Sequence, residues 1–255
     1  MPESKYEPEL RIVAFLDILG FREQTRRCLK DPALLEVLDR SLRSADMLAE
    51  PYDGYRTDAR MFSDCICSSS PFTPDNVFKF IYSLEAVQMN LAANGVFIRG
   101  GIAIGKHFEN ERMIVSEGLI DAYLLESKQA VFPRIITSEN TFLRLADALT
   151  NAGPDRWDDG PTTVTRSIDT HLRKDSDGVR FLSYLMSLHR IDRSAIVMEY
   201  IDGHKRSVEE WLAEGKNADT PPSVRAKHEW VREYHNLAVS EFFRCPIGEA
   251  EEFIK

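Results

Sequence analysis

The sequence predicts an α+β fold, in which a ferredoxin-like core has an antiparallel-rich sheet covered by helices on one face and is followed by a helical C-terminal extension. Strand and helix patterns run in the order β-α-β-β-α-β, and then α-β, over the first half of the chain. This is the order of a ferredoxin-like sandwich. The pattern then weakens and ends in helices. We expect one domain over residues 8–190, with residues 191–255 packed on it as the extension.

A strand, a helix and a hairpin account for the first part of the chain. The continuous apolar run in residues 10–18 predicts a buried strand. Leucines at helical spacing predict a helix over 31–50, with Asp31 as N-cap and Pro32 in the first turn. Residues 55–70 predict two strands that turn near Ser63 and Asp64.

The elements that follow alternate again. A helix over 74–95 closes at Gly95. A glycine-rich strand over 96–108 allows another backbone or a ligand to approach closely. The remaining predictions are a short strand and a helix in 113–127, strands in 130–139, 164–169 and 179–185, and helices in 207–215 and 223–243.

Composition excludes several functional classes. A net charge of -9 argues against a protein that coats nucleic acid. No apolar run approaches the roughly 18 residues of a membrane span, and the polar N-terminus is unlike a signal peptide. The spacing of Cys28, Cys65, Cys67 and Cys245 fits neither a disulfide framework nor a zinc site. We therefore expect a cytoplasmic protein without a nucleic-acid or membrane partner.

Two acids follow apolar runs at strand ends, Asp17 in FLDILGF and Asp64 in MFSDCIC. A hairpin beside the first strand would bring them together, and paired carboxylates repel unless a cation lies between them. Oxygen ligands of this kind suit Mg²⁺ or Mn²⁺ with substrate phosphates. Gly20 would form a tight turn whose N–H groups face those phosphates. On spacing alone, both acids could equally be ordinary strand-end or turn residues.

Four segments together resemble the class III nucleotidyl cyclases. FLDILGF and FSDCI resemble the two metal motifs of that family, IRGGIAIG its fourth strand and EGLIDAYLLES the following helix. The short single-domain form, the FSDCI variant and the helix EWVREYHN are most similar to the pyrimidine cyclases of bacterial Pycsar antiphage defence systems. Those enzymes make cyclic UMP or cyclic CMP, which activates a separate effector.

The resemblance implies two Mn²⁺ or Mg²⁺ ions per site, bound by Asp17, Asp64 and the carbonyl of Ile18. One ion would activate the ribose 3′-hydroxyl for attack on the α-phosphate, and the other would hold the β- and γ-phosphates while pyrophosphate leaves. Leu19, Gly20 and Phe21 would form the turn that faces the phosphates. The resemblance also implies a head-to-tail homodimer with composite active sites.

The chain departs from the family where purine cyclases carry a transition-state Asn and Arg, since these places hold Ile120 and Leu124. Another cation must then neutralise charge. Arg99 is the first candidate, although it could be a plain surface residue; Lys128 and Arg134 follow.

The purine-selecting residues are not evident either, so Tyr55 or Arg60 could contact a smaller base, unless Tyr55 is simply core. We expect conversion of UTP to cyclic UMP. Cyclic CMP production and a non-catalytic nucleotide-binding module are the alternatives.

Overall fold

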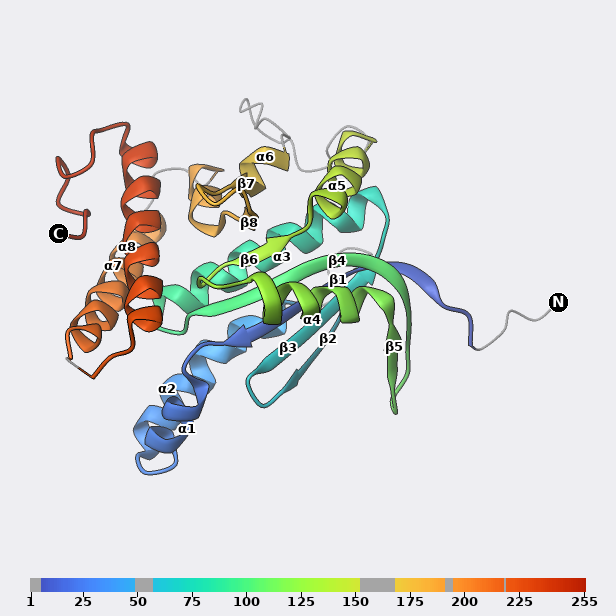
Figure 1. Cartoon of the computed structure of the whole chain (residues 1–255), viewed down its shortest axis with the longest axis horizontal. Coiled ribbons are helices and arrows are strands. Elements are labelled where there is room, and N and C mark those ends of the chain that lie inside the picture. The colour runs from blue at the N-terminus through green and yellow to red at the C-terminus, as the bar shows by residue number, and fades with distance from the viewer. Residues whose placement is uncertain (1–5, 49–56, 152–167, 191–194, 218) are drawn as a thin grey trace.

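A computed structural model describes residues 6–48, 57–151, 168–190, 195–217 and 219–255 (Figure 1). The elements in chain order are β1 (Glu9–Ile18), α1 (Phe21–Cys28), α2 (Pro32–Leu42), η1 (Arg43–Leu48), β2 (Asp58–Phe62), β3 (Cys65–Pro71), α3 (Pro74–Ala93), β4 (Ile98–Glu109), β5 (Ile114–Ser116), α4 (Glu117–Gln129), β6 (Ile135–Thr137), α5 (Glu139–Asn151), α6 (Ile168–His171), β7 (Leu172–Lys174), β8 (Arg180–Leu182), η2 (Tyr184–Arg190), α7 (Ala195–Gly215) and α8 (Pro222–Phe243).

The predicted α+β fold is confirmed. The strands form one sheet in the order β2-β3-β1-β4-β6-β8-β7, with β5 paired to β4. All pairs are antiparallel except β4 with β6. Read from β4, the first four strands follow the order β4-β1-β3-β2, which results from two β-α-β units interleaved around β1. Strand β1 is therefore central and buried, with β3 and β4 on its two sides.

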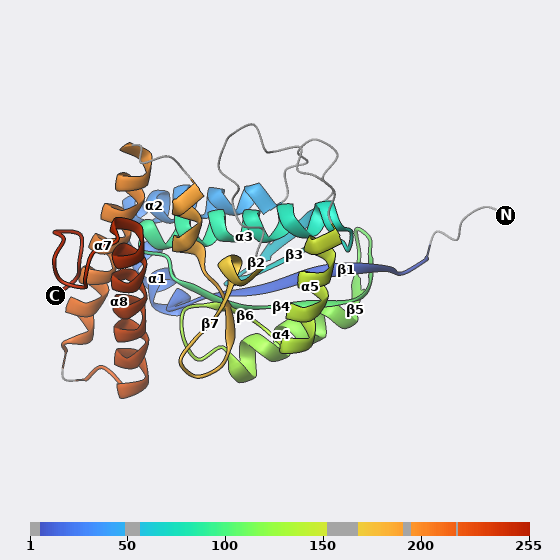
Figure 2. The same cartoon turned by 90° about the horizontal axis from the view of Figure 1, so that it is seen from above.

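The prediction that helices cover one face was wrong, because α4 lies on the opposite face from α2 and α3 (Figure 2). Glycines make this second layer fit. A Cβ on Gly101 would lie 2.2 Å from the Ala122 carbonyl oxygen, and one on Gly105 would lie 2.4 Å from the Gly118 nitrogen. Only glycine lets a helix approach a strand so closely. The glycines of the strand thus seat α4 rather than a ligand.

Strand β1 divides its side chains between these layers. Ile12, Ala14 and Leu16 join the core beneath α3, whereas Phe15 packs edge-on against Tyr123 of α4, with ring centroids 5.5 Å apart. Side chains alternate along a strand, so Asp17 lies on the same face as Phe15. The sheet thus presents its acid on the α4 side.

The C-terminal helices stand at the end of the sheet where β1 finishes (Figures 1 and 2). A second core cluster joins α7 and α8 to the sheet and η2, through residues that include Phe97, Ile136 and Phe181. The division at residue 190 remains a prediction. Within the described ranges, none of the helices combines the length and apolar character needed to cross a bilayer.

Buried polar groups connect the C-terminal helices to one another. Tyr184 Oη lies 2.8 Å from His204 Nε2, the Nδ1 atoms of His204 and His235 are 3.0 Å apart, and His235 Nε2 lies 2.9 Å from the Glu252 carbonyl. Burial lowers the pKa of both imidazoles, so both are neutral at pH 7. The Glu252 carbonyl only accepts, so neutral His235 donates to it and accepts from His204, which in turn accepts from Tyr184.

The observed elements differ from the predicted ones in several places, and α5 and β7 were not predicted. The eight residues of α1 have no apolar period, and α1 was not predicted. Helix α2 ends at Leu42 and continues as η1. The strand predicted over 164–169 is wrong at Ile168 and Asp169, which begin α6, and its other residues lie outside the described ranges. Helix α7 begins at Ala195, well before residue 207.

Candidate active site

Two carboxylates meet at the end of β1. Asp17 pairs with Cys65 of β3 across the sheet, and Asp64 occupies the turn just before Cys65. The Ile18 N–H donates to the Asp64 carbonyl at 2.8 Å, which fastens the hairpin turn to β1. Ligand atoms of Asp17, Asp64 and Cys65 all lie within 4.8 Å of one another. The predicted convergence of the two acids is therefore present.

The hairpin turn aims Asp64 through an unusual backbone. Phe62 and Cys65 pair directly, which leaves Ser63 and Asp64 as a two-residue loop. Ser63 has φ 57, in the left-handed region that such loops require and non-glycine residues rarely adopt. Conformational strain of this kind is often found at functional sites.

The charges of the pair favour a bound cation. Burial raises the pKa of Asp17, the neighbouring Asp64 adds to this rise, and Arg99 offsets only part of it. Burial and the two acids raise the pKa of Cys65 to about 11, so its thiol stays protonated and is a poor ligand. Two carboxylates without a thiolate fit a hard cation such as Mg²⁺ or Mn²⁺. The donor set thus fits the metal that the sequence predicts.

Arg99 lies directly opposite Asp17 in the β1–β4 register. Its Nε donates to Asp17 Oδ2 at 3.1 Å and also lies 2.7 Å from Glu126 Oε1. Glu126 belongs to the last turn of α4 and is 4% exposed, and burial raises its pKa. Sequence reasoning missed this third carboxylate. The available signal was its place on the stripe of α4 that also buries Ala122 and Leu125.

Helix α8 brings a second cation toward the site. Lys227 interacts electrostatically with Asp17, Glu126 and Arg99, and burial lowers the pKa of Lys227. The helix is held there by Trp230, whose ring stacks on Phe132 at 5.8 Å between centroids. Sequence reasoning missed Lys227, because nothing local indicates where α8 docks.

The predicted phosphate-facing turn lies between β1 and α1. Leu19 packs against the C-terminal core cluster and Phe21 against the α3 cluster, so both side chains anchor the turn. Gly20 between them is exposed with φ 73, and α1 begins at the next residue. The free N–H groups of a helix N-terminus attract anions. The structure thus brings this helix N-terminus next to the strand that carries Asp17.

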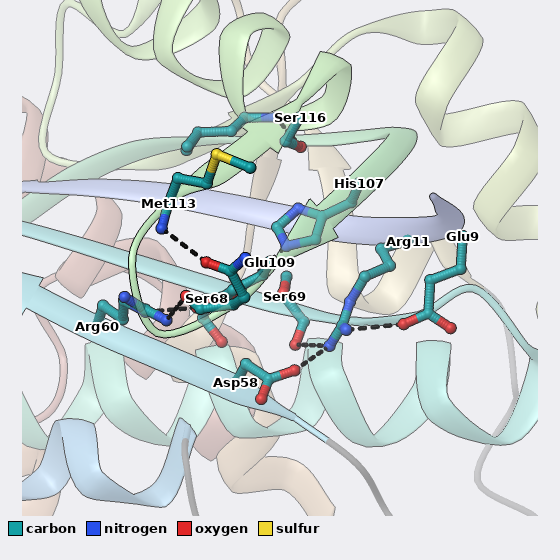
Figure 3. Close-up of polar contacts among 12 residues, drawn as sticks. Glu9, Arg11, Asp58, Arg60, Ser68, Ser69, His107, Glu109, Met113 and Ser116 are labelled. Carbon is teal, nitrogen blue, oxygen red and sulfur yellow. Dashed lines mark hydrogen bonds and ion pairs between the residues drawn. The ribbon is translucent and has the colours of Figure 1, made fainter. Parts of the chain in front are cut away.

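Arg60 of β2 lies on the same face of the sheet as Asp17. It pairs with Cys67 of β3, two residues along the strand from the Phe62–Cys65 pair. Its Nε forms an ion pair with Glu109, and its Nη2 donates to the Asn110 carbonyl at 2.6 Å (Figure 3). Its side chain remains 45% exposed. A half-exposed arginine with one fixed carboxylate can present its remaining N–H groups to a ligand.

The remaining predicted residues are Lys128, Arg134 and Tyr55. Lys128 is exposed on the last turn of α4. Arg134 is 1% exposed, and its guanidinium is bound by Asp175 and Asp177. Tyr55 lies outside the described residues. We therefore leave Arg134 out of the site proposed below.

No protein-family profile and no curated protein matches the sequence. Solved structures that resemble the chain include the guanylyl cyclase Cya2, with TM-score 0.39 and 15% identity over 55% of this chain and 80% of that one. A bacterial light-regulated adenylyl cyclase has TM-score 0.37 and 15% identity over 56% of this chain and 46% of its own. A class III adenylyl cyclase-like ATP-binding protein from Pseudomonas aeruginosa has TM-score 0.36 and 11% identity over 55% and 35%. At these values the chemistry must be argued from the chain's own residues.

Proposed function

We propose that this chain is a nucleotidyl cyclase of the class III type, which converts UTP to 3′,5′-cyclic UMP and pyrophosphate with two Mn²⁺ or Mg²⁺ ions per site. One observation carries the proposal: Asp17 on β1 and Asp64 in the β2–β3 turn bring their carboxylate oxygens within 4.8 Å of each other, beside an arginine. The sequence motifs around both acids support the same chemistry.

The chain's own residues divide the work. Asp17, Asp64 and the Ile18 carbonyl hold the metal ions, which when bound neutralise phosphate charge and acidify the ribose 3′-hydroxyl. The turn of Leu19, Gly20 and Phe21 and the N-terminus of α1 bind phosphate oxygens. Arg99 stabilises the charge that develops on the phosphates. Catalysis then depends on in-line positioning and on charge stabilisation.

Arg60 is the residue proposed to read the pyrimidine. Its contact with Glu109 fixes the half-exposed guanidinium on the α4 side of the sheet, where it can donate to O2 or O4 of the base. Tyr55, on the segment leading into β2, is the second candidate. Selectivity over purines would come from a filled pocket and from polar groups left unpaired by the wrong base.

The proposal extends to assembly and to biological role. Ile120 and Leu124 on the outer face of α4, together with Phe62 at the hairpin, are 61%, 43% and 85% exposed. Apolar side chains of this size on an outer face suit a second copy of the chain, as in a homodimer with composite sites. Lys128 would contact the nucleotide from this helix. The cyclic nucleotide would act in the cytoplasm as a second messenger to a separate effector in antiphage defence.

A second candidate function is a non-catalytic nucleotide-binding module of the same fold. The exposed apolar pair Ile120 and Leu124 favours it, because the resemblance expects an Asn and an Arg there. The paired acids favour the enzyme, because a module that only binds has less need to tolerate two adjacent anions.

The test is incubation of the purified protein with each of the four NTPs and Mn²⁺, followed by separation of products by mass. Cyclic UMP is expected from UTP, and cyclic CMP from CTP would identify the alternative substrate. An Asp64→Asn protein is the control for contaminating activity. Nucleotide binding without any cyclic product would replace the enzyme by the binding module.

A further inference from the structure

Arg99 lies between two acceptors but has a single Nε hydrogen. That hydrogen is directed at Asp17, with a donor–acceptor distance of 3.1 Å. Glu126 Oε1 is nearer, at 2.7 Å, yet it lies outside hydrogen-bond geometry and has no hydrogen-bond partner among the described residues. A small rotation of the guanidinium would therefore move the hydrogen bond from one carboxylate to the other.

The backbone of α4 holds this second acceptor in place. Leu125, next to Glu126, packs on Gly101 of β4, which is two residues beyond Arg99. Arg99 Nη1 also donates to the carbonyl of Ala130, the residue that caps α4, at 3.3 Å. The C-terminal end of a helix attracts cations. The end of α4 is thus a ready second position for the Arg99 side chain.

Metal binding would disturb the first position. A divalent cation on Asp17 and Asp64 repels a guanidinium on the same carboxylate. Arg99 must then either leave the site or move to another acceptor. Since its side chain is only 27% exposed and is surrounded by the end of α4, the near acceptor is Glu126.

We infer that Glu126 is a positioning residue, which receives Arg99 from Asp17 when divalent cations bind and so keeps the guanidinium beside the phosphates. The inference rests on the proposed function. In the metal-free protein, Arg99 neutralises part of the charge on Asp17. In the loaded protein, Glu126 and the Ala130 carbonyl hold Arg99, while its outer N–H groups become available to substrate.

The test follows the Arg99 Nε–H group by NMR in arginine-labelled protein during titration with Mg²⁺ alone. An Arg99→Lys protein assigns the signal. The signal should shift on Mg²⁺ addition, and its proton should still exchange slowly with water. The reason is that the Nε–H group passes from one carboxylate acceptor to the other. A shift accompanied by rapid exchange with water would overturn the inference from the wild-type protein alone, whatever the variants do.

Glu126→Gln removes the charge at nearly constant shape. In this protein, Mg²⁺ should speed exchange of the Arg99 Nε–H roughly tenfold, because the neutral amide oxygen of Gln accepts a weaker hydrogen bond than a carboxylate does. Glu117→Gln, at the exposed first turn of the same helix, is the matched control and should behave as wild type. Equal exchange in the two variants would refute a role for Glu126.

Turnover separates this inference from the proposed function. Glu126→Gln should lower kcat about 10- to 100-fold, as loss of a supporting residue typically does, with little change in KM for the nucleotide. A protein that neither binds Mg²⁺ nor turns over any NTP would refute the proposed function. Normal metal binding with unchanged kcat in Glu126→Gln would refute only the inference.

Discussion

Arg99 and Arg134 each lie between two carboxylates, but the two clusters differ in the direction in which the pKa values of their acids shift and in access. Arg99 donates its Nε–H to Asp17 and also lies 2.7 Å from Glu126 Oε1, and burial raises the pKa of both acids. Arg134 binds Asp175 and Asp177 and is enclosed by three aromatic rings. Burial acts to raise the pKa of Asp177, but the hydrogen bonds from Arg134 and Val179 outweigh it, so that pKa is lowered.

The difference distinguishes a site from a structural contact. In the Arg134 cluster the guanidinium satisfies its acids, and Trp230 of α8 donates to Asp175 at 2.7 Å. In the Arg99 cluster the guanidinium contacts Asp17 and Glu126, and Glu126 also interacts electrostatically with Asp64 and Lys227. Excess negative charge in a half-buried place is costly without a further cation. Raised pKa values of the acids around an arginine therefore mark the Arg99 cluster, and not the Arg134 cluster, as the candidate site.

The largest expected effect comes from substitution of Asp64 in the Arg99 cluster. Asp64→Asn should lower cyclic nucleotide production on the order of a thousandfold, the scale seen when a charge-stabilising group is removed. The melting temperature without metal should be unchanged or higher, because one of two like charges is gone. Product is measured by mass and stability by thermal unfolding.

Asp39→Asn, on the exposed surface of α2, is the control for Asp64→Asn and should keep full activity. Near wild-type turnover in Asp64→Asn would remove the metal assignment and, with it, the contrast between the two clusters.

Substitution of Arg134 in its cluster with Asp175 and Asp177 should instead lower stability. Arg134→Ala leaves two partly buried carboxylates without their partner and removes packing against Phe132 and Trp230, so the free energy of unfolding should fall by about 3 kcal/mol. Urea denaturation measures the loss. Activity per folded molecule should change little at a temperature where the protein stays folded. A stable but inactive Arg134→Ala would return Arg134 to the nucleotide site.

A third prediction concerns pH. It depends on His204 and His235, a neutral pair that is buried and structural like the Arg134 cluster. Burial lowers the pKa of His235 to about 4 and that of His204 well below its usual range. Lys205 lowers the pKa of His235 further, whereas the Glu252 carbonyl and Asp202 act to raise it. The unfolded chain therefore binds protons that the folded chain excludes, and stability falls as pH drops from about 6.5 toward 4.

For His235 alone the loss is about 2 kcal/mol between pH 7 and pH 5, by the linkage relation. Denaturation at several pH values measures it, and His235→Gln should show a shallower slope than wild type. Equal slopes in the two proteins would mean that the pair does not control acid stability.

The smallest expected effect concerns Arg60, whose side chain is half-exposed and forms an ion pair with one acid, Glu109. Arg60→Ala should lower the ratio of kcat/KM for UTP to that for ATP by roughly tenfold, the scale of one or two hydrogen bonds to a base. Arg40→Ala, on the exposed face of α2, is the matched control. An unchanged ratio would move base selection to Tyr55.

Local patterns explain most of what the sequence predicted. The buried run of β1, the N-cap at Asp31 and the tight hairpin at Ser63 and Asp64 are specified within a few residues, so their elements were found. Asp31 Oδ1 accepts from the Ala33 N–H at 3.0 Å, as expected of a cap. The meeting of Asp17 with Asp64 followed from these local elements, because a hairpin beside β1 has few alternatives.

Features that depend on packing were missed. Glu126 is distinguished only by burial, and Lys227 only by the docking of α8. The glycines of β4 predicted that a backbone or a ligand approaches closely, and the backbone of α4 does so at Gly101 and Gly105, but the sequence did not indicate which element or which face. The ion pairs of Arg134 with Asp175 and Asp177, which lie some forty residues further along the chain, were likewise not predicted.

The glycine contacts also make the site uneven in stiffness. Because the backbones of β4 and α4 are in contact, the distance between Arg99 on β4 and Glu126 on α4 is fixed by close packing. Asp64 sits instead on a two-residue loop at an exposed hairpin tip, tied down by one backbone hydrogen bond to Ile18. The β2–β3 hairpin is therefore the part of the site that moves most easily. Cations of different radius would be accommodated by movement of Asp64, not of Arg99.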